Sequence, residues 1–69
     1  MNVFSEINKD ISYLKMQIGE EKNEEYERKC INEFLDRNNV IRKLFYENGL
    51  EDEELMVKII LFMVKLKID

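Results

Sequence analysis

Few side chains in this sequence have the chemistry of a catalytic group, and their spacing does not assemble a catalytic set. The 69 residues include no histidine, which is the usual general base near neutral pH and the usual nitrogen ligand of metal ions. Ser5 and Ser12 are the only serines, and no base lies near either in sequence. Gly19 and Gly49 are isolated, whereas a phosphate-binding loop needs clustered glycines. We therefore expect no enzymatic activity and no cofactor.

Carboxylates and one thiol are the remaining reactive groups. Acid pairs such as Glu20 and Glu24 are one helical turn apart, but a cation site needs more converging oxygens, so we expect no metal. Cys30 lies between Tyr26 and Phe34 in an apolar stripe, which is typical of a small core residue, with a redox or dimer-crosslinking thiol as the alternative. A lone cysteine and the absence of an export signal favour a cytoplasmic location.

Three cations form the one local basic cluster: Arg37, Arg42 and Lys43. They favour an alternative function as a nucleic-acid-binding dimeric regulator, in which they would contact phosphates. The net charge of −4 opposes that interpretation, because it repels a polyanion at long range. A helix-turn-helix around Gly49 would also present the acids at 51–54 to the phosphates first.

The carboxylates, the thiol and the cations named above must all be positioned by helices. The first helix is predicted over residues 2–18. Its apolar positions recur in steps of three and four, as on one face of a helix, and they are Phe4, Ile7, Ile11, Leu14 and Ile18. Gly19 either ends this helix or only weakens a longer one.

A second helix is predicted from Glu24 to Glu47, with Asn23 as its N-cap. Opposite charges four residues apart should support it, at the pairs Glu24–Arg28, Glu25–Lys29 and Glu33–Arg37. The apolar stripe is interrupted at Asn38 and Asn39, so the helix is either continuous or broken there, with Asn39 capping a short helix from Val40.

Gly49 and Leu50 should end the second helix. Gly49 suits the left-handed residue that follows a helix, and Leu50 would then return to Phe45 in a Schellman motif.

The third predicted helix is apolar in nearly every direction, since eleven of the fourteen residues at 55–68 are apolar. Fourteen residues span about 21 Å, too short for a bilayer core of about 30 Å. We therefore expect a buried central helix. Two other helices cover about two of its sides, which predicts a homodimer. The candidate core or dimer residues are Leu55, Met56, Ile59, Ile60, Phe62, Met63 and Leu66.

The predicted fold is all-α: a single domain over residues 1–69, a small three-helix bundle made of a helical hairpin and an extra helix, doubled in a homodimer. Tyr13 and Met16 project away from the first apolar seam and, with Tyr46, are candidate partner-interface residues. The alternative is that they are scattered exposed apolar residues.

The leading functional hypothesis is a small non-enzymatic protein-binding module, a regulator or inhibitor of another protein. Abundant Lys, Ile, Asn and Glu, with no Ala, Thr or Pro, favour an AT-rich gene of a low-GC bacterium or of a phage or plasmid in one. The target would then be a host enzyme or defence system. A second alternative is a peripheral membrane module, in which the last helix lies on lipid with its lysines extended to the headgroups.

Overall fold

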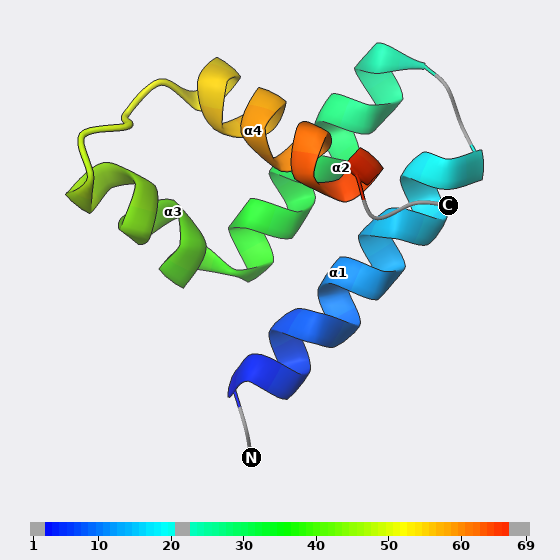
Figure 1. Ribbon diagram of the computed structural model, residues 1–69, viewed down its shortest axis with the longest axis horizontal. Coiled ribbons are helices and arrows are strands. Elements are labelled where there is room, and N and C mark those ends of the chain that lie inside the picture. The colour runs from blue at the N-terminus through cyan, green and yellow to red at the C-terminus, as the bar shows by residue number, and fades with distance from the viewer. Residues whose placement is uncertain (1–2, 21–22, 67–69) are drawn as a thin grey trace.

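The computed structural model describes the backbone at residues 3–20 and 23–66 and side chains at 5–19 and 23–66. Within these ranges it consists of four helices and no strand: α1 (Val3–Glu20), α2 (Glu24–Arg37), α3 (Asn39–Glu47) and α4 (Glu53–Leu66) (Figure 1). The all-α class is confirmed. The second predicted helix is in fact two helices, so the described chain is not the simple three-helix bundle expected. The Phe4 and Glu20 side chains lie outside the described residues.

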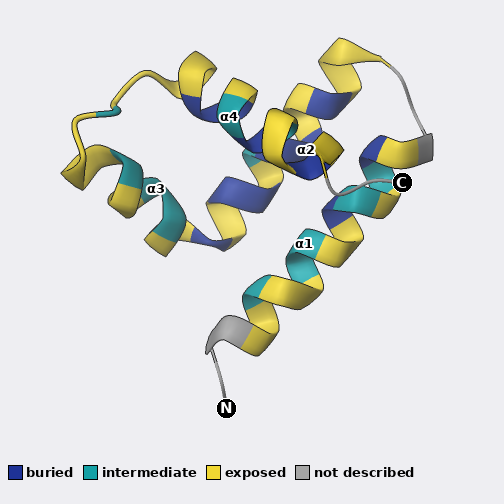
Figure 2. Ribbon diagram, in the orientation of Figure 1, coloured by how far each residue is buried: buried dark blue, intermediate teal, exposed yellow. Residues whose placement is uncertain are grey.

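Helices α1 and α2 pack as a hairpin, and α4 lies across α2 (Figure 1). Their shared core consists of Leu14, Ile18, Cys30, Ile31, Phe34, Leu35, Met56, Val57, Ile60 and Val64. Burying each large aliphatic or aromatic side chain in this cluster stabilises the fold by about 1.5–3 kcal/mol. Figure 2 shows buried residues along α2, on α4 where it crosses α2, and on the second half of α1.

Charged side chains join α2 to α4 beside this core. Glu27 is only 3% exposed, and its Oε2 lies 3.4 Å from Lys65 Nζ. Arg28 Nη2 lies 3.2 Å from Glu54 Oε2. The expected pairing of Arg28 with Glu24 inside α2 is therefore wrong, because the crossing helix brings a carboxylate of α4 within reach.

Asn38 separates α2 from α3, with φ −118° and ψ 61°. Its buried side-chain Nδ2 donates hydrogen bonds to Asp10 Oδ2 at 2.9 Å and to the Phe34 carbonyl at 3.0 Å. The second predicted helix is therefore broken at Asn38, which the sequence had given as one of two alternatives. The capping role predicted for Asn39 is wrong, because Asn39 is already the first residue of α3. Asn38 takes the cap position but makes no side-chain cap bond; its Nδ2 donates to Asp10 and to the Phe34 carbonyl instead.

The predicted Schellman motif ends α3. Gly49 has φ +81°, which favours glycine, and its N–H donates to the Tyr46 carbonyl at 3.0 Å. The Leu50 N–H donates to the Phe45 carbonyl at 2.8 Å. Both bonds match the motif, so the next helix starts in a defined direction.

The two other helix-end predictions have different outcomes. Asn23 caps α2 as predicted, since its Oδ1 accepts a 3.1 Å hydrogen bond from the Tyr26 N–H. Gly19 lies inside α1, which runs on to Glu20, so it does not end the helix. No helix within the described ranges has the length and apolar character needed to span a bilayer.

Candidate functional site

Helix α3 is packed less closely than the other helices. None of its nine residues is buried, although Val40, Ile41, Leu44 and Phe45 give it one apolar face (Figure 2). Ile41 and Phe45 are half-buried, while Val40 and Leu44 are exposed. The apolar face of α3 therefore borders a space that the described residues do not fill.

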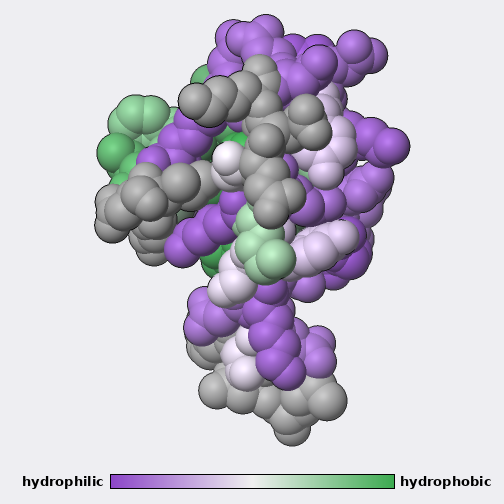
Figure 3. Space-filling model, turned by 90° about the vertical axis from the view of Figure 1, so that its right-hand side faces the viewer, coloured by the Kyte–Doolittle hydropathy of each residue, from purple (hydrophilic) through white to green (hydrophobic). Residues whose placement is uncertain are grey.

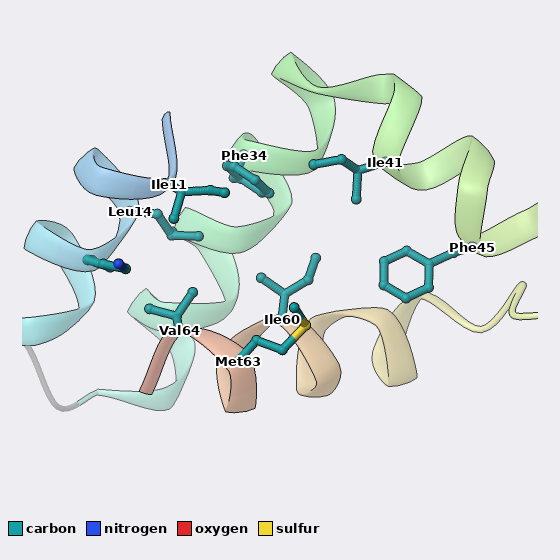
Figure 4. Close-up of a pocket in the computed structure, with 9 residues that line it drawn as sticks. Ile11, Leu14, Phe34, Ile41, Phe45, Ile60, Met63 and Val64 are labelled. Atoms are coloured by element: carbon teal, nitrogen blue, oxygen red, sulfur yellow. The ribbon is translucent and has the colours of Figure 1, made fainter. Parts of the chain in front are cut away.

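That space is an apolar groove with a volume of about 170 Å³, bordered by all four helices. Figure 4 shows eight apolar side chains directed toward it. The lining residues are Ile11, Leu14, Lys15, Phe34, Ile41, Phe45, Ile60, Met63 and Val64. Its lining is apolar except for Lys15, so this groove suits apolar side chains of a partner.

Beside the groove, α4 carries a row of apolar residues on its outer surface, here called the α4 stripe: Leu55, Ile59, Phe62, Met63 and Leu66. Phe62 is 64% exposed and Leu66 is 66% exposed, and Ile59 alone is half-buried. Their spacing of three and four residues places them on one helix face. Met63 belongs to both the stripe and the groove, so the two form a continuous apolar surface.

The structure divides the seven candidate residues of the last helix between two surroundings. Met56 and Ile60 are buried in the core, whereas the other five form the α4 stripe. Within the described residues of one chain, α4 is covered on one face only, where it crosses α2, so burial of its other face by a second molecule stays a prediction. Figure 3 shows a mostly hydrophilic side of the molecule with hydrophobic side chains gathered at one edge.

The three candidate interface residues do not come together. Tyr13 and Met16 are exposed on α1, on the surface directed away from the buried Leu14. Tyr46 is exposed on α3, where its hydroxyl contacts Glu53 Oε1 at 3.4 Å. The structure therefore assembles no single site from these residues.

Arg42, from the candidate basic cluster, links α3 to α2 and α4 through two carboxylates. Its side chain is 17% exposed, and its Nη1 donates to Asp36 Oδ1 at 3.0 Å. Its Nε lies 3.1 Å from Glu53 Oε1, an ionic contact without the alignment of a hydrogen bond. The hydrogen bond to Asp36 raises the pKa of the guanidinium, with Glu53 acting in the same direction and burial opposing it.

The other two cations of that cluster are placed differently. Arg37 Nε lies 4.0 Å from Asp10 Oδ2 on α1, rather than pairing with Glu33 as expected. Lys43 is exposed on α3. Two of the three cations thus lie beside carboxylates of their own chain, which leaves less positive charge for a phosphate.

Other reactive groups form no site in the described chain. Cys30 is buried in the core, at the position that the sequence predicted. No three cysteine, aspartate or glutamate side chains at 5–19 and 23–66 gather in a way that could hold a metal ion.

Sequence reasoning missed the groove, because its walls come from four separate helices. A signal was present in α3, where Val40, Ile41, Leu44 and Phe45 form an apolar face on a helix too short to be a core element by itself. Lys15, the one charged residue of the groove, had no such signal.

No protein-family model matches this chain, and neither the curated proteins nor the solved structures include a significant match to it.

Proposed function

We propose that this protein is a non-enzymatic protein-binding module, a regulator or inhibitor of another protein, and that it binds through the groove and the α4 stripe. The open apolar groove is the observation that supports this function best. Helical grooves lined by aliphatic and aromatic side chains commonly take the apolar face of a partner helix.

The exposed apolar surface supports the same proposal. Phe62 and Leu66 are nearly two-thirds exposed next to the groove. Clustered apolar exposure of this kind marks interaction sites more often than scattered single residues do.

Self-association is an alternative use of the same surface, since a second copy would also cover the α4 stripe. The expected homodimer would bury Phe62 and Leu66 between the two chains. Sedimentation equilibrium at micromolar concentration tests it: a mass of one chain would exclude this dimer.

The source of the gene, the target and the cellular location are also proposals. The AT-rich residue usage supports a gene of a low-GC bacterium or its phages and plasmids, with a host enzyme or defence protein as the target and the cytoplasm as the location.

A site-specific photo-crosslinker tests the binding surface directly. Benzoylphenylalanine at Met63 places the reactive group between the groove and the stripe, and the same residue at the exposed Lys29 on α2 is the matched control. After irradiation in lysate of a low-GC bacterium, we expect a covalent adduct with another protein from Met63 and none from Lys29. Equal labelling at both positions, or labelling at neither, would contradict the proposal.

A further inference from the structure

From the charges around this surface, we infer that its partner is an acidic amphipathic helix, with an apolar stripe flanked by aspartate or glutamate. This inference rests on the proposed function and adds the chemistry of the partner. It depends on where the lysines of α1 and α4 lie relative to the apolar residues.

Lysines border the apolar surface on two sides. Lys58 follows Leu55 by three residues and precedes Phe62 by four, so it lies beside both along one edge of the α4 stripe. Lys65 follows Phe62 by three residues and continues that edge. Across the groove, Lys15 of α1 is part of the lining. A helix seated on this surface would therefore have cations along both of its flanks.

These cations are available to a partner. Neither Lys58 nor Lys15 has an ion pair among the described residues, and Lys58 is exposed. Lys65 contacts Glu27 but keeps 56% of its side chain exposed. The chain as a whole has a net charge of −4 and carries acids at 51–54 before the stripe, but these three lysines place positive charge along the flanks of the surface. They favour acidic side chains on the flanks of a partner and disfavour basic ones.

A second copy of this chain fits the surface less well. In an antiparallel two-fold pair, the same edge of each α4 meets its equivalent, so Lys58 and Lys65 would lie opposite the partner's lysines. In a parallel pair, the acids at 51–54 of both copies would lie together. Either symmetric arrangement brings like charges close, whereas the acidic flanks of a partner helix could lie beside the lysines of α1 and α4.

A lipid surface also fits less well, although exposed apolar residues flanked by lysines are typical of interfacial helices. The groove is concave, and its walls come from all four helices, so a flat bilayer would leave it unfilled.

Three designed helical peptides test the inference. They share one leucine stripe, and their flanking positions are all Glu, all Lys or all Gln. Fluorescence anisotropy against the full chain at about 50 mM salt should show the Glu peptide binding at least about tenfold more tightly than the Lys peptide. Raising the salt to about 500 mM should reduce that ratio, because surface charges are then screened.

Two double variants test whether the preference for the Glu peptide over the Lys peptide comes from Lys15 and Lys58. We expect K15Q/K58Q to reduce the Glu-to-Lys ratio below about threefold, while the matched variant K29Q/K43Q, with the same change in net charge, leaves it unaltered. M63E should weaken all three peptides. Far-UV circular dichroism of each variant establishes that loss of binding is not loss of folding.

The outcomes separate this inference from the proposed function. Equal binding of the three peptides, lost in M63E, would overturn the acidic partner but leave the groove as a protein-binding site. A dimer that no peptide dissociates would assign the surface to a second copy. Flotation with phosphatidylserine vesicles that is lost in K15Q/K58Q, without any peptide preference, would assign it to lipid. If no peptide binds and the Met63 crosslinker captures nothing, both proposals fail.

Discussion

The two apolar faces of α4 have similar side chains and different surroundings. One face packs on α2 and contains Met56, Val57, Ile60 and Val64, all buried. The other face is the α4 stripe, whose members are exposed except for the half-buried Ile59. Composition does not distinguish these faces, since both are aliphatic, aromatic or methionine side chains. The position of α2 and the sparse packing of α3 decide which face stabilises the fold and which is free to bind.

The largest expected effect compares one substitution on the two faces. Met56→Ala removes a fully buried side chain and should lower the free energy of unfolding by about 2–5 kcal/mol. A domain of this size has roughly 3–10 kcal/mol in total, so much of the stability would be lost. Met63→Ala, on the stripe, should change it by less than about 0.5 kcal/mol. Urea denaturation followed by circular dichroism measures both, and similar losses would refute the division of α4 into two faces.

The next effect concerns the junction that orients α3. Asn38→Ala removes the hydrogen bonds to Asp10 and Phe34 and should lower stability by about 1–3 kcal/mol, since buried polar groups lose partners. Asn39→Ala is the matched control, because Asn39 is exposed and its side chain makes no described hydrogen bond. The same urea titration distinguishes them. If Asn39→Ala lowered the free energy of unfolding more than Asn38→Ala, the Asn38 side chain would not be what stabilises the break.

A smaller effect, with opposite signs, compares the two glycines. Gly49→Ala forces a side chain into the left-handed region at φ +81° and should cost about 1 kcal/mol. Gly19→Ala lies in α1 with open space around its added methyl group, so it should stabilise the fold by about 0.5–1 kcal/mol. Thermal denaturation should therefore shift in opposite directions. A shift in the same direction for both would contradict the described helix ends.

The smallest effect on stability should come from Phe62→Ser on the α4 stripe. Phe62 is mostly exposed, so the free energy of unfolding should change by less than about 0.5 kcal/mol. Binding of the Glu-flanked peptide should nevertheless weaken by at least about tenfold, because a large exposed aromatic residue of the α4 stripe is lost. Anisotropy titration and urea denaturation on the same sample measure the two quantities. A large loss of stability with unaltered peptide binding would show that Phe62 supports the fold and not the binding surface.

Local signals in the sequence were sufficient for two helix ends, the start of α2 and the end of α3. Asn23 as an N-cap and the turn at Gly49 and Leu50 were predicted because capping depends on residues within one turn. The break at Asn38 was recognised only as an alternative. Its position depends on Asp10, which is 28 residues away in sequence.

Long-range features could not be predicted in the same way. Arg28 and Arg37 were assigned partners four residues away in α2, but they lie beside Glu54 and Asp10 of other helices. Helical periodicity shows which side chains share a face but not which neighbouring helix covers it. The seven candidate residues of the last helix included all five stripe residues, and separating them from Met56 and Ile60 required the crossing of α4 over α2.

The sparse burial of α3 also bears on how the protein should respond to heat. A helix of nine residues is too short to persist by itself in water, so α3 depends on Arg42 and on its two ends. Its amide protons should exchange with deuterium sooner than those in the middle of α2, because few apolar contacts oppose local opening. An occupant of the groove would slow that exchange, so ligand engagement and the ordering of this segment are thermodynamically coupled.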